Sequence, residues 1–111
     1  MEKFLAQAQG LKNEIITRRR DLHKHPESAW TEFRTASLVA QELVNLGFEV
    51  LVGAQVIVEK EMMGVPDALT LKKCQERALQ EGADAKWVEK MQGGKTGVMG
   101  VMKFAKPGKT V

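Results

Sequence analysis

The segment from Thr96 to Phe104, with the sequence TGVMGVMKF, places the strongest constraint on the fold. Its apolar residues fall on both faces of an extended chain, which is typical of a strand that is buried on both sides. Gly97 and Gly100 indicate that another backbone approaches this strand closely. The turn AKPGK follows, and the sequence stops at Val111, where a further strand is expected. Such a strand needs neighbours on both faces, so we expect a truncated α/β domain.

A long amphipathic helix is predicted over residues 2–25. Proline disfavours a helical conformation in the residue before it, so Pro26 ends this helix. Steps of three, four and seven residues are typical of one helical face. The apolar stripe at this spacing consists of Phe4, Ala8, Leu11, Ile15 and Leu22.

A second helix is predicted from Ser28 or Thr31 to Leu46. The Thr31 hydroxyl is the candidate cap, because threonine oxygens accept hydrogen bonds from free amides at helix starts. Gly47 ends the helix, as glycine does in the left-handed position after a helix. The alternating sequence FEVLV then predicts a strand from Phe48, which residues 55–58 extend.

The middle of the chain is polar and reads as helical. Trp87 and Met91 lie four residues apart, on one face of a short helix. The expected starts and stops in this region are, in order, Asp67 or Thr70, Gly82, Asp84 and Gly93–Gly94. The predicted order is therefore helix, helix, strand, helices, strand.

Composition narrows the function classes. The chain has 111 residues and a formal net charge of +3, and its basic residues are interleaved with acids except in the run Arg18–Arg20. This pattern argues against nucleic-acid binding, which clusters basic residues on one face. Cys74 is the single cysteine, which fits a reducing compartment. No apolar run approaches the ~18 residues of a membrane span, and the N-terminus lacks a secretory signal, so we expect a cytoplasmic protein.

The two histidines, His23 and His25, are the first candidates for metal binding. On a helix, residues two apart point to different faces, whereas a helical zinc pair needs a spacing of four. A closed zinc site also needs about four ligands, and the chain has no third histidine. A structural role is therefore favoured over a metal site.

Four further candidates have structural interpretations that outweigh the functional ones. The sequence GGKTG at residues 93–97 faintly resembles a phosphate loop, but the required upstream glycine is Glu89 and the strand follows the loop. Glu27 and Glu32 are a candidate carboxylate pair, although acids are common at helix starts. Trp30 and Trp87 are expected in the core or at an interface, and Cys74 is expected to be a buried, inert thiol.

The stretch from Arg18 to Val50 resembles the N-terminus of a family of metal-dependent amidohydrolases, which includes aminoacylases and indole-acetyl-amino-acid hydrolases. The matching residues are Arg19, Arg20, Leu22, His23, Pro26, Glu27, Glu32–Thr35 and Leu46–Val50. The later sequence GKTGVMGVMK resembles the family's second strand. Most members join these two strands by a short turn. Residues 59–94 therefore look like a helical insert, similar to that of the subgroup that cleaves p-aminobenzoyl-glutamate.

The resemblance implies that residues 1–111 are an incomplete piece of a three-layer αβα metallohydrolase catalytic domain. It implies two divalent metals, zinc or manganese, in the complete enzyme, which is expected to be oligomeric. The family's metal-binding stretches and its general-base glutamate have no counterpart here, so we assign no catalytic, cofactor-binding or metal-binding residue. His23 and Glu27 match positions that help to shape the domain in this family.

We therefore predict the N-terminal segment of an amidohydrolase that cleaves an amide bond to an amino acid and is inactive alone. The alternative is a non-catalytic interaction module from a truncated reading frame. Such a module would self-associate, or add its exposed sheet edge to a partner.

Overall fold

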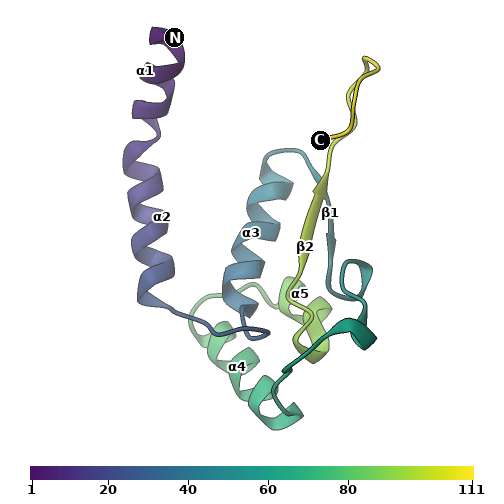
Figure 1. Cartoon of the computed structure of the whole chain (residues 1–111). Helices are drawn as coiled ribbons and strands as arrows, with labels where there is room; N and C mark the ends of the chain where they lie inside the picture. Colours follow the sequence, from purple (N-terminus) through teal and green to yellow (C-terminus); the bar gives the residue numbers. More distant parts are fainter.

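The N-terminal third of the chain begins with two nearly collinear helices that stand apart from the rest (Figure 1). The computed structural model describes residues 1–111, and these helices are α1 (Glu2–Gly10) and α2 (Lys12–Lys24). We call α1 and α2 the arm. The single helix predicted over residues 2–25 is interrupted at Leu11, next to Gly10, the poorest helix former of the segment. No residue of either helix is buried.

Helix α3 (Phe33–Asn45) is the centre of the structure, and it buries five residues from its first two turns. It ends as predicted, with Gly47 at φ +90°. The predicted cap was wrong: Glu32 occupies the capping position, and the Thr31 hydroxyl instead donates to the carbonyl of Ser28 at 2.8 Å. The chain therefore makes a local turn before the helix begins.

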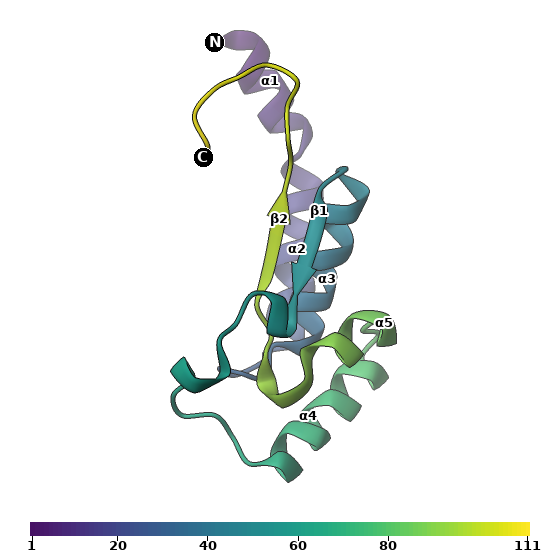
Figure 2. The same cartoon turned by 90° about the vertical axis from the view of Figure 1, so that its right-hand side faces the viewer.

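The sheet has two antiparallel strands, β1 (Glu49–Val52) and β2 (Val98–Val101), and Val52 pairs with Val98. Figure 2 shows α3 behind the two strands, so the helix covers one face of the sheet. The close approach expected at Gly97 and Gly100 is present, but its source differs from the prediction. A Cβ atom at either glycine would meet side chains, those of Ile57 at Gly97 and of Phe48 and Leu43 at Gly100.

Only one face of the second strand is covered within this chain, as expected of a strand whose neighbours the sequence does not contain. Strand β2 is shorter than residues 96–104, and its face away from α3 is uncovered, with Met99 42% exposed. The extension of the first strand through residues 55–58 was wrong. Gly53 adopts φ +64° and turns the chain into the 3₁₀ helix η1 (Gly53–Gln55).

The middle segment folds back onto α3. Its elements are η2 (Glu59–Glu61), α4 (Ala68–Gln80), α5 (Ala85–Val88) and η3 (Glu89–Gly94). The predicted starts at Asp67 and Asp84 are confirmed, because each carboxylate accepts a hydrogen bond from an amide in the helix that it precedes. The buried residues of this segment join α3 and β1 in one core: Phe33, Ala36, Ala40, Val52, Leu71, Ala78, Trp87, Val88 and Met91. We call residues 33–101 the body.

None of the helices has the length and apolar character that crossing a membrane requires.

Candidate functional site

The elbow between α2 and α3, residues 25–32, is where the arm meets the body. Glu27 is its central acid. One carboxylate oxygen of Glu27 accepts a hydrogen bond from the amide of Arg34 at 2.8 Å. The other accepts from the amide of Thr35 at 2.8 Å and from its hydroxyl at 2.7 Å. Glu27 therefore caps α3 from outside the helix, where a negative charge also suits the helix dipole.

Arg34 is the second organiser of the elbow, and it is buried. Its Nη2 atom donates to both carboxylate oxygens of Asp21, at 2.8 and 3.0 Å, and its Nε atom donates to the carbonyl of Glu81 at 2.9 Å. One guanidinium thus ties the end of α2 and the end of α4 to α3. The hydrogen bond from Arg34 is the main reason that the pKa of Asp21 lies below its usual value.

The two histidines do not form a site. His25 is half-buried, and its Nδ1 atom lies 3.0 Å from the carbonyl oxygen of Asp21 and 3.5 Å from an Asp21 carboxylate oxygen. His23 is exposed on the last turn of α2. Nowhere do three or more His, Cys, Asp or Glu side chains gather in a way that could hold a metal ion.

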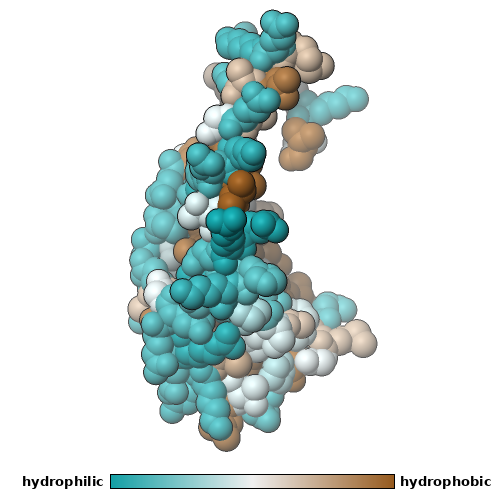
Figure 3. Space-filling model, turned by 90° about the vertical axis from the view of Figure 1, so that its left-hand side faces the viewer, coloured by the Kyte–Doolittle hydropathy of each residue, from teal (hydrophilic) through white to brown (hydrophobic).

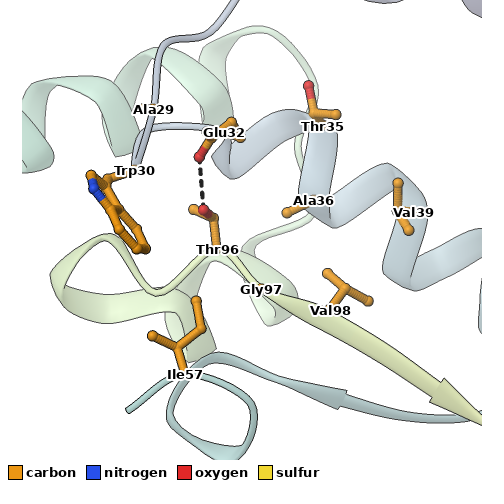
Figure 4. Close-up of a pocket in the computed structure, with 10 residues that line it drawn as sticks. All are labelled: Ala29, Trp30, Glu32, Thr35, Ala36, Val39, Ile57, Thr96, Gly97 and Val98. Atoms are coloured by element: carbon orange, nitrogen blue, oxygen red, sulfur yellow. Dashed lines mark hydrogen bonds between the residues drawn. The ribbon is translucent and has the colours of Figure 1, made fainter. Parts of the chain in front are cut away.

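An open cavity of about 560 Å³ lies beside the elbow, between α3 and the start of β2 (Figure 4). Its one acid is Glu32, whose carboxylate accepts a hydrogen bond from the Thr96 hydroxyl at 2.8 Å. Trp30 lines the cavity in the left-handed backbone conformation, φ +66°, and its indole N–H donates to the carbonyl of Met63 at 2.8 Å. Glu27 and Glu32 have separate partners, and the cavity holds no second titratable group for acid–base chemistry.

The other candidates have local partners. In the sequence GGKTG, the Lys95 ammonium lies 3.5 Å from a carboxylate oxygen of Glu59, and Thr96 is bonded to Glu32. Because β2 begins directly afterwards, the segment is the helix stop that was predicted. Trp87 is buried in the core and donates to the side-chain oxygen of Gln41. Cys74 is half-buried and packs against the core.

Comparison with known proteins identifies relatives that are much longer than this chain. No family model matches the sequence. The chain is 47% identical over 90 residues to a p-aminobenzoyl-glutamate hydrolase subunit from Escherichia coli, covering 81% of this chain and 21% of that protein. It is 40% identical over 98 residues to indole-3-acetyl-aspartic acid hydrolase from Enterobacter agglomerans, covering 88% of this chain and 22% of that protein.

The structural comparison agrees with the sequence comparison. The crystal structure of an aminobenzoyl-glutamate utilization protein from Klebsiella pneumoniae matches 96% of this chain and 26% of its own, with a TM-score of 0.88 and 40% sequence identity. The chain is homologous to about the N-terminal fifth of these hydrolases and spans about a fifth of their length. The resemblance identified from the sequence is thereby confirmed.

The sequence did not pair Asp21 with Arg34, although Arg34 lies within the matching stretch Glu32–Thr35. A signal was present, because Arg34 lies between Phe33 and Ala36, two apolar residues that are three apart on one helical face. Arginine is almost never buried without a charged partner. That rule predicts a partner for Arg34, but the sequence does not say that Asp21 is the residue in reach.

Proposed function

We propose that this chain forms the N-terminal part of the catalytic domain of a metal-dependent hydrolase that cleaves an amide bond to an amino acid. The proposed substrate class is p-aminobenzoyl-glutamate and similar conjugates of an aromatic acid. The proposed domain is a three-layer αβα structure in which β1 and β2 belong to a larger sheet. The observation that carries this proposal is the TM-score of 0.88 over 96% of the chain to the protein from Klebsiella pneumoniae.

The metal centre of such a hydrolase does not fit the residues of this chain. The histidines do not converge, and no cluster of potential ligands exists. We therefore derive no catalytic step for residues 1–111. We propose that the chain alone is inactive, and that the ligands for two divalent metals, zinc or manganese, come from polypeptide outside it.

We further propose that residues 59–94 are an insert relative to family members with a short connection between the strands. The strand pairing supports this proposal. Val52, the last residue of β1, lies opposite Val98, the first residue of β2, so a tight turn would be enough to join them. Instead the chain leaves the sheet, builds α4 and α5 against α3, and returns.

The function is tested with a chimera in which this chain replaces the matching quarter of the protein from Klebsiella pneumoniae. We expect the chimera to hydrolyse p-aminobenzoyl-glutamate with manganese or zinc present, and the isolated chain to give no turnover above buffer. The unmodified parent protein, prepared in parallel, is the control. A folded but inactive chimera would contradict the proposed activity, and turnover by the isolated chain would contradict its proposed inactivity.

A non-catalytic interaction module is the second candidate, and the unpaired edges of the sheet favour it. Each of the two strands has only one neighbour, so β1 and β2 each present a free edge to which another strand can add. Size-exclusion chromatography separates the two candidates: a stable oligomer of the isolated chain favours the module.

For either function we propose a cytoplasmic location, because the single cysteine Cys74 is unpaired.

A further inference from the structure

Two open cavities lie side by side on α3 and share two of their lining residues. The first, of about 560 Å³, lies between α3 and β2, and the second, of about 470 Å³, lies between α3 and α2. Thr35 and Val39 line both cavities and therefore lie where the two cavities meet. We call this surface the trough, and its defining residues are Leu22, Thr35, Leu38, Val39, Leu43 and Val98.

The trough is apolar along its floor and charged at its wall. Leu38 and Val39 remain 40% and 46% exposed although they belong to the central helix of the body. An ion pair between Arg18 and Glu42, 2.9 Å apart, connects α2 to α3 at the edge of the second cavity. An apolar groove with charged edges between two helices is the kind of surface that takes the apolar face of a further helix.

The surfaces around the trough are also uncovered. The apolar stripe that was predicted along the arm is exposed, with Phe4 70% exposed. Figure 3 shows the side of the arm that faces away from the body, where the surface is mostly hydrophilic with scattered apolar groups. Strand β2, which forms the opposite wall of the trough, has an unpaired edge.

The solved relative contains polypeptide that has no counterpart in this chain. About three quarters of the protein from Klebsiella pneumoniae lies outside the region that matches this chain. The match includes 96% of the chain, so the arm is held in a similar position in that protein. Within this chain, polar contacts of Arg18 and Asp21 connect the arm to the body, but the arm buries no residue here.

We propose that the trough is the docking surface for the rest of a hydrolase of this family, which places an apolar helix over Val39 and a strand beside β2. This inference rests on the proposed function. Because the surface is open in the chain as it stands, docking requires no covalent connection. The chain should therefore bind the remainder of a relative that is supplied as a separate polypeptide.

The test is co-expression of the tagged chain with the part of the protein from Klebsiella pneumoniae that lies outside the matched region. We expect this remainder to be recovered with the chain in a one-to-one complex. Val39→Asp should lower recovery at least about tenfold, because docking would bury an unpaired carboxylate. Val39→Ala should give an intermediate loss. Leu69→Asp is the matched control, since Leu69 is 62% exposed on α4 and outside the trough.

Far-ultraviolet circular dichroism of each variant alone confirms that the body still folds. Equal recovery with Val39→Asp and Leu69→Asp would overturn the proposal, as would a remainder that stays insoluble beside the chain. Recovery of the chain only as its own oligomer would identify a second copy as the occupant and would also overturn it. Hydrolysis by the complex is measured separately: a one-to-one complex without turnover contradicts the proposed function and leaves the docking intact.

Discussion

The arm and the body are both built from amphipathic helices, yet only the body buries its apolar face. Phe33 and Met91 in the body are fully buried, whereas Phe4 at the start of the arm is 70% exposed. The arm reaches the body through polar contacts, mainly the ion pairs of Arg18 with Glu42 and of Asp21 with Arg34. An amphipathic pattern therefore identifies a helix face that is suited to packing, but it does not show that the same chain covers that face.

The largest expected difference between the two regions comes from truncating one phenylalanine in each. Phe33→Ala should lower the free energy of unfolding by about 3–5 kcal/mol, because it leaves a cavity in a small core. Phe4→Ala should change it by less than about 0.5 kcal/mol, since the side chain is exposed. Urea denaturation followed by tryptophan fluorescence measures both values. Equal losses would show that the arm is part of the cooperative core.

The next largest loss of stability is expected at the Arg34 guanidinium, which joins the arm to the body. Arg34→Met should cost about 2–3 kcal/mol, because it removes the bonds to Asp21 and leaves the Glu81 carbonyl without its donor. Arg19→Met, on the exposed side of the arm, is the matched control and should have an effect within about 0.5 kcal/mol. The same denaturation assay applies. Equal losses of unfolding free energy for the two arginine variants would show that Arg34 does not stabilise the fold through its contacts at the elbow.

The pH dependence of the free energy of unfolding tests the contact between Asp21 and Arg34 separately. The folded-state pKa of Asp21 is lowered, so its stabilising contribution is fully present above the ordinary aspartate pKa of about 3.9. That contribution is lost as the pH falls through the lower folded-state value. Asp21→Asn should therefore show a smaller loss of stability than the natural chain between pH 4 and more acidic conditions. Asp67, whose pKa is lowered by the amide of Thr70, contributes equally in both proteins.

A smaller effect is expected from the carboxylate that caps α3. Glu27→Ala should destabilise the body by about 1 kcal/mol, because two amides at the start of α3 lose their acceptor. Glu14→Ala on the arm, which loses only an exposed ion pair with Arg18, should cost less than about 0.5 kcal/mol. Thermal unfolding followed by circular dichroism measures both. A loss at Glu27 no larger than the loss at Glu14 would argue against the capping role.

The smallest effect is expected at the break in the arm. Gly10→Ala should raise the helical signal, because alanine favours a helix by about 1 kcal/mol over glycine and the added methyl group would meet nothing beyond its neighbours in the helix. The unfolding midpoint of the body should not move. A raised midpoint would mean that the arm and the body unfold together.

The sequence predicted the elements whose signals are local. The ends of α3 and α4 follow from Gly47 and Gly82, and the start of α4 follows from Asp67, because caps and left-handed glycines depend on neighbours in sequence. The apolar residues on both faces of β2 indicated neighbours that the sequence does not contain, and the face of β2 away from α3 is uncovered. The sequence predicted where the elbow lies between the two helices. It did not show that Arg34 on α3 pairs with Asp21 on α2.

The resemblance to amidohydrolases was identified from residues in and around the elbow, and the structure explains what those residues do. Glu27 and Arg34 hold α2, α3 and α4 together. These hydrogen bonds occupy the Glu27 carboxylate and the Arg34 guanidinium, which a catalytic interpretation would require to be free. The uncovered trough was not predicted, because its two walls come from segments that are far apart in the sequence.

Amide hydrogen exchange of the isolated chain tests most directly the claim that the body folds on its own core while the arm depends on polypeptide outside the chain. Short helices without tertiary cover are marginal in water. We therefore predict that amides of residues 2–24 exchange at least about a hundredfold faster than those of α3 and α4, which share the core. Protection of the arm equal to that of α3 would contradict the claim.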